Sequence, residues 1–98
     1  MTLEYMCMEI IRDYLELYKS GRVSLESLVW ISATVLKIVG HENLATRVMS
    51  NPESAPRILE ELTQKYFGLV SGPAVYVMNL GELVKELNKS LEEEKQSQ

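Results

Sequence analysis

The chain has 98 residues, a hydrophobic fraction of 46% and a formal net charge of −4. This length allows one domain with a modest core, and it excludes a core that also surrounds a deep enclosed pocket. The single cysteine and the single histidine exclude a disulfide framework and a multi-cysteine or histidine-based metal site. A general nucleic-acid coat protein would be basic, which this chain is not.

The chain also lacks the sequence signals of a membrane or secreted protein. No apolar run approaches the roughly 20 residues that span a bilayer. The N-terminus has no basic start followed by an apolar stretch, which a secretory signal requires. We therefore expect no membrane partner, a reducing environment and a cytoplasmic location.

The first predicted element is an amphipathic helix over residues 2–19. Its apolar residues recur at spacings of three and four, and the glycine at position 21 is expected to end it. The residues predicted to face the core are Leu3, Met6, Cys7, Ile10, Ile11, Tyr14, Leu17 and Tyr18.

A second helix is predicted over residues 25–39, with Ser24 as its N-cap and Gly40 at its end. It is apolar on nearly all sides, which is typical of a helix that is buried on most sides. Trp30 is therefore predicted in the core. An anchor at a protein interface is the alternative for this residue.

The next segments predict a short helix over residues 42–50, a turn at 50–54 and a fourth helix that begins near Ser54. Two β-favouring runs, 67–70 and 74–78, flank Ser71-Gly72-Pro73 and predict a hairpin. A last helix is predicted from residue 80, with Asn79 as a candidate cap. Its apolar stripe is Leu80, Leu83, Val84, Leu87 and Leu91.

From residue 24 to residue 79 this order of elements resembles a winged helix-turn-helix domain. Residues 42–49 would be the first helix of the motif, Ser50 to Glu53 its turn, and Ser54 to Leu62 the start of the recognition helix. Leu69-Val70 and Val75 to Met78 would be the strands of the wing. The fold class that we predict is mainly α, a winged-helix-like helical domain with one short β-hairpin.

The resemblance implies a small, dimeric, DNA-binding transcription regulator, in which an added N-terminal helix often serves dimerisation. Ser54, Arg57 and Gln64 would face the major groove of double-stranded DNA, and Arg47 and Lys65 would reach the phosphates. The predicted organisation is one domain, with an N-terminal helix (1–21), a winged-helix-like core (24–80) and a C-terminal helix with an acidic tail (80–98).

The charge pattern supports an alternative, a helical protein-interaction module or a small subunit of a larger assembly that does not bind DNA. Residues 67–79 contain no lysine or arginine, and the outward face of the fourth helix would carry Glu53, Glu60 and Glu61. Glutamates on a recognition face repel phosphates. Both interpretations stay open at the level of the sequence, and both allow a homo-oligomer.

Neither interpretation is an enzyme. Cys7 lies on the apolar side of the first helix, where a buried structural thiol is expected. His41 lies after Gly40, where a surface or capping residue is expected rather than a general base. No glycine-rich phosphate loop is present. We predict no catalytic residue, no cofactor and no metal.

Overall fold

The computed structural model describes residues 2–71 and 80–96. All regular secondary structure in these residues is helical. The helices are α1 (Leu3–Lys19), α2 (Leu25–Ile38), α3 (Glu42–Ser50), a 3-10 turn η1 (Pro52–Ser54), α4 (Ala55–Ser71) and α5 (Leu80–Gln96). The prediction of a mainly α fold is confirmed at this level.

The ends of the first two helices follow from local chemistry. The Ser24 side chain accepts a hydrogen bond from the backbone N–H of Ser27 at 3.1 Å and so caps α2. Gly21 and Gly40 have positive φ angles of 77° and 88°, a conformation that residues with a side chain rarely adopt. The predicted start of α2 and both predicted helix ends are therefore confirmed.

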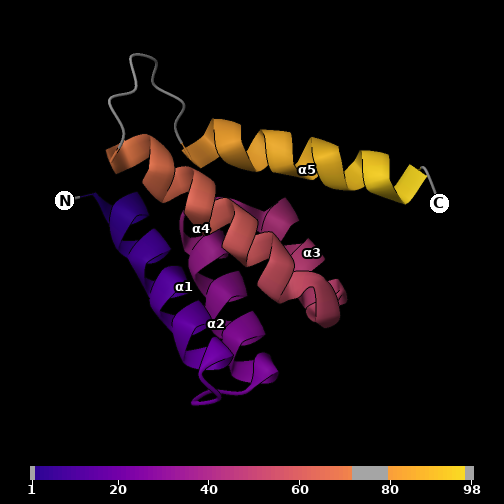
Figure 1. The fold of residues 1–98 in the computed structure, drawn as a ribbon. Coiled ribbons are helices and arrows are strands. Elements are labelled where there is room, and N and C mark those ends of the chain that lie inside the picture. The colour runs from indigo at the N-terminus through magenta and orange to yellow at the C-terminus, as the bar shows by residue number, and fades with distance from the viewer. Residues whose placement is uncertain (1, 72–79, 97–98) are drawn as a thin grey trace.

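The helices form two layers around one core. α1 and α2 lie side by side and contact each other, and α4 runs obliquely to them and contacts α1 more extensively than any other helix (Figure 1). α3 packs mainly against α2, and α5 lies against α4 and α3. The largest fully buried side chains include Met8, Ile11, Leu28, Leu36, Leu44, Leu59 and Leu80.

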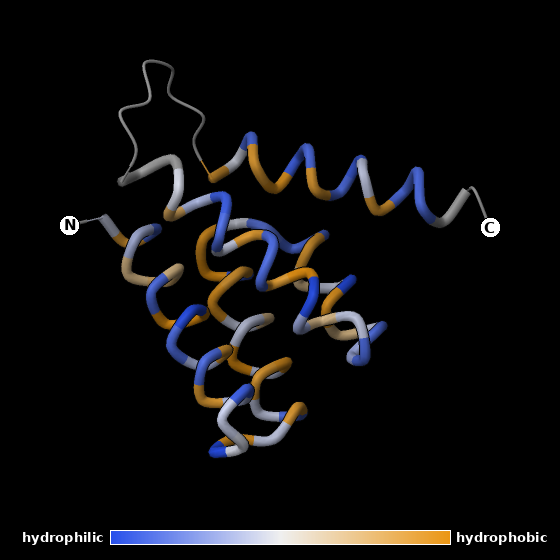
Figure 2. Tube along the Cα trace, viewed as in Figure 1, coloured by the Kyte–Doolittle hydropathy of each residue, from blue (hydrophilic) through white to orange (hydrophobic). Residues whose placement is uncertain are grey.

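α5 is an amphipathic helix whose apolar side packs against the rest of the chain. Figure 2 shows that hydrophobic residues return along it once per turn. Leu80, Leu83, Val84 and Leu87 are all buried within this chain. The apolar stripe predicted for the last helix therefore packs inside the protein down to Leu87.

The winged-helix prediction is wrong. The first predicted strand, residues 67–70, is the C-terminal part of α4, which continues through Gly68 to Ser71. The second predicted strand, 74–78, lies outside the described residues. Tyr66 and Phe67 extend the α4 contact with α1, because both rings pack against Tyr5. These tertiary contacts outweigh the β propensity of the segment.

Several residues predicted to face the core are exposed instead. Trp30 is 66% exposed, and Leu3, Met6 and Ile10 of α1 are exposed as well. Ile38, in the last turn of the largely apolar α2, is 58% exposed. Trp30 therefore lies on a side of α2 that faces solvent and not in the core. Cys7, by contrast, is buried as predicted.

Candidate interaction surfaces

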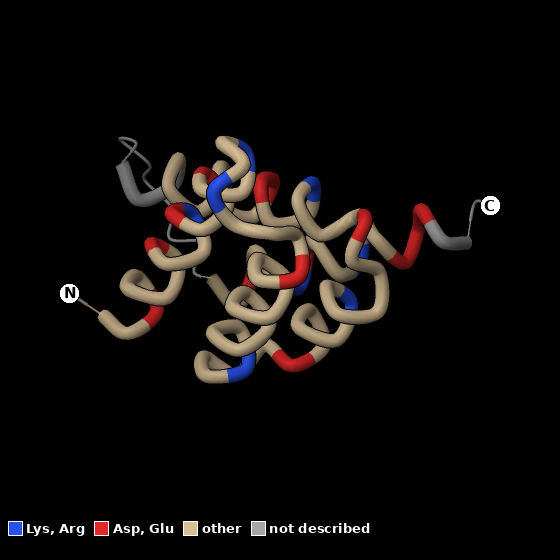
Figure 3. Tube along the Cα trace, turned by 90° about the horizontal axis from the view of Figure 1, so that it is seen from below, with Lys and Arg blue, Asp and Glu red and all other residues tan. Residues whose placement is uncertain are grey.

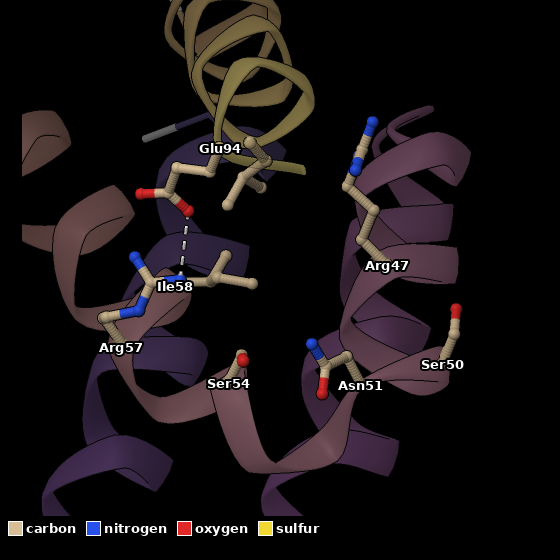
Figure 4. Close-up of a pocket in the computed structure, with 8 residues that line it drawn as sticks. Arg47, Ser50, Asn51, Ser54, Arg57, Ile58 and Glu94 are labelled. Carbon is tan, nitrogen blue, oxygen red and sulfur yellow. Dashed lines mark hydrogen bonds and ion pairs between the residues drawn. The ribbon is translucent and has the colours of Figure 1, made fainter. Parts of the chain in front are cut away.

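The residues predicted to touch DNA lie on two parts of the α3–η1–α4 corner. Arg47 belongs to α3, Ser54 ends η1, and Arg57 lies in the first turns of α4. These three residues line one cleft of about 410 Å³ (Figure 4). Gln64 and Lys65 lie two turns further along α4 and do not line the cleft.

The basic side chains of this corner are paired with glutamates. Arg47 donates to Glu92, and Arg57 donates to Glu94 at 3.4 Å, so that the end of α5 supplies both acceptors. Lys65 pairs with Glu61 at 3.1 Å, and Lys19 of α1 pairs with Glu60 at 2.6 Å. Gln64 donates to Glu60 at 3.4 Å. The positive charge that DNA binding needs is therefore offset by nearby carboxylates.

The distribution of charge over the described chain agrees with this local pairing. Figure 3 shows acidic and basic residues interspersed over the face in view, with no separate basic patch on it and acidic residues towards the end of α5. A surface that reads DNA carries clustered lysine and arginine. A mixed surface of this kind is typical of contact with protein or solvent.

A second surface consists of apolar side chains that the core does not use. Leu3, Met6 and Ile10 follow one side of α1 at spacings of three and four, and Trp30 and Ile38 lie eight residues apart on α2. These five residues, called here the exposed apolar set, are between 40% and 66% exposed. Because α1 and α2 are packed neighbours, the set belongs to one pair of helices.

An aromatic cluster fixes α4 on α1 at the far end from the cleft. The rings of Tyr66 and Phe67 meet edge to face at 5.2 Å, and the Arg12 guanidinium lies 4.3 Å from the centre of the Phe67 ring. Tyr66 is buried and donates from its hydroxyl to Glu4 at 3.3 Å. The contacts of Arg12 with Phe67 and of Glu4 with Tyr66 join residues more than fifty positions apart, so no local sequence pattern predicts them.

Burial, the nearby Glu4 carboxylate and the hydrogen bond to it raise the pKa of Tyr66 from 10 to about 12. A raised pKa means that the folded state holds the phenol proton more tightly, so this contribution is present below pH 10 and is lost as the pH rises towards 12. Two pKa units correspond to about 2.7 kcal/mol. We therefore expect the Tyr66→Phe variant to lose less stability than the wild type as the pH rises, by the contribution of the Tyr66 phenol.

The measurement is the free energy of unfolding by urea between pH 9 and pH 11.5. Tyr18→Phe, which changes a partly buried tyrosine of α1, controls for the loss of one phenol from the chain. An equal slope of stability against pH in the wild type and Tyr66→Phe would contradict the assigned role of Tyr66.

Cys7 and His41, the two residues considered as possible reactive groups, lie in structural positions. Burial raises the pKa of the Cys7 thiol, which disfavours the reactive thiolate. His41 precedes α3, where its side chain makes no capping hydrogen bond. Burial lowers the His41 pKa, and the Glu4 charge opposes this shift in part. Among residues 2–71 and 80–96, no group of three potential metal ligands was found.

Comparisons with known proteins add no family to this description. No family model, no curated protein and no solved structure matches the chain. The helices of the described segments are also too short or too polar to cross a membrane.

Proposed function

We propose that this chain is a non-catalytic helical protein-interaction module that associates with a second copy of itself through the exposed apolar set of α1 and α2. The observation that carries the proposal is the exposure of Trp30, 66% of whose surface is open to solvent. Tryptophan is among the residues that contribute most to protein interfaces, because it buries a large area with few rotatable bonds.

The geometry of α1 and α2 supports a second copy as the partner. These helices form a hairpin in which α1 packs on α4 and α2 packs on α3, and the residues of the exposed apolar set belong to these two helices. Two such hairpins related by a two-fold axis would form a four-helix arrangement, a common way to bury apolar helix faces. The dimerisation role predicted for residues 1–21 is retained in this proposal.

Double-stranded DNA, the partner predicted first from the sequence, receives less support. The arginines and the lysine predicted to contact it are each paired with a glutamate. A duplex would have to displace these carboxylates before it met a positive surface.

Sedimentation velocity over a wide range of protein concentration, together with a titration of labelled duplex DNA at low salt, tests the proposal. We expect the sedimentation coefficient to rise from that of a monomer to that of a dimer. We expect no binding of the duplex at micromolar protein. A monomer at every concentration would contradict self-association, and salt-dependent binding of the duplex would favour the DNA-binding alternative.

A further inference from the structure

The cleft at the α3–η1–α4 corner separates two helices that contact each other little. Arg47 of α3 and Arg57 of α4 lie on opposite sides of it (Figure 4). α3 packs on α2, and α4 packs on α1, far more extensively than α3 and α4 pack on each other. The two walls of the cleft therefore belong to different parts of the fold.

The C-terminal part of α5 forms ion pairs with both walls. Glu92 accepts a hydrogen bond from Arg47, and Glu94 accepts one from Arg57 at 3.4 Å. Successive helical residues are about 100° apart around the axis, so Glu92 and Glu94 lie on either side of Leu91, which lines the cleft. Glu93 lies on the side of α5 opposite to Leu91, and it is exposed and makes no ion pair with a described residue.

The two halves of α5 are attached in different ways. Leu80, Leu83 and Leu87 are each no more than 4% exposed, whereas Leu91 is only partly buried. The Glu92 and Glu94 side chains remain 51% and 53% exposed in their ion pairs. Salt weakens the attraction between such exposed charges, because it screens them over roughly 10 Å at 0.1 M ionic strength. The end of α5 is therefore held by contacts that respond to ionic strength, and its start is held by apolar packing.

We propose that residues 91–94 are a strap that ties α3 to α4 across the cleft through these two ion pairs, and that the strap is released when the charges are screened. With the ion pairs formed, one helical turn connects both walls. When they are lost, this turn frays and the walls of the cleft lose their common tie, so that both open locally more often. The strap is a conformational device that is separate from self-association through α1 and α2.

Hydrogen exchange of backbone amides, followed by mass spectrometry at low and high salt, tests the proposal on the full chain. We expect residues 91–94 to exchange roughly three- to tenfold faster at about 0.5 M salt than at about 0.02 M, because two exposed ion pairs are weakened. Residues 50–57, which connect the two walls, should exchange faster in parallel. Residues 83–87, in the buried part of α5, should keep their exchange rates.

Glu92→Gln together with Glu94→Gln should reproduce the effect of high salt at low salt, and added salt should then change little. Glu93→Gln is the matched control, because it removes the same charge from the same turn on the side away from the cleft. It should keep the exchange rates of the wild type. Loss of a glutamate near a helix C-terminus favours the helix itself, so faster exchange in the double variant would report the lost ion pairs.

Exchange of residues 91–94 that does not depend on salt would overturn the proposal, as would equal acceleration by Glu93→Gln and by the double variant. Faster exchange confined to residues 91–94 would overturn it as well, because the walls of the cleft would then not depend on the strap. If the double variant folds poorly as judged by circular dichroism, the salt series on the wild type still decides. Sedimentation measures self-association through Trp30 separately, so failure of either proposal can be recognised.

Discussion

Leu36→Ala is expected to lower the free energy of unfolding by about 2–5 kcal/mol, the usual cost of removing a large side chain from a packed core. Leu36 is fully buried in α2, the helix that makes the most extensive contacts with α3 and α1. The lost methyl groups leave a cavity that helices on both sides would have to close. For a chain of this size such a loss is a large part of the total stability.

Ile38→Ala is the matched control, two residues further along the same helix. Ile38 is 58% exposed, so its truncation should change the stability of the monomer by no more than about 0.5 kcal/mol. Urea unfolding of both variants at low protein concentration measures the two effects without a contribution from association. Equal losses would contradict the assignment of these residues to the inner and outer sides of α2.

Trp30→Glu is expected to weaken self-association by roughly 30-fold or more, because loss of a central interface tryptophan costs at least about 2 kcal/mol of binding free energy. The glutamate would also bring a charge into an apolar contact. Since Trp30 is exposed in the single chain, the same change should leave the stability of the monomer nearly unaltered. The dissociation constant from sedimentation equilibrium gives the first effect, and urea unfolding gives the second.

Met49→Glu provides the control for Trp30→Glu. Met49 is also an exposed apolar residue, at 45%, but it belongs to α3 and lies outside the exposed apolar set. It should keep the dissociation constant of the wild type. A similar loss in both variants would mean that the added charge, and not the α1–α2 surface, weakens association.

The sequence predicted those parts of the fold that depend on neighbouring residues. Ser24 caps α2 through a hydrogen bond three residues away, and Gly21 and Gly40 end helices through their own backbone conformation. The prediction of a wing strand at residues 67–70 was wrong because Tyr66 and Phe67 are held in α4 by contacts with Tyr5, a residue from the other end of the chain. β propensity carries no information about such a partner.

The placement of Trp30 failed for a different reason. In a helix that is apolar on nearly all sides, the sequence pattern does not indicate which side faces solvent. The sequence also could not show that α5 supplies the carboxylates for the arginines of the predicted DNA-binding surface, because Arg47 and Glu92 are 45 positions apart. The residues predicted for DNA binding thus include three that share a cleft, but their electrostatic environment follows from tertiary structure alone.

The emission of Trp30, the only tryptophan in the chain, measured over serial dilution tests the central claim most directly. If a second copy covers the α1–α2 surface, the emission maximum moves to shorter wavelength as the protein concentration rises, in parallel with the sedimentation coefficient. An emission maximum typical of exposed tryptophan at every concentration, in a protein that sediments as a monomer throughout, would contradict the claim.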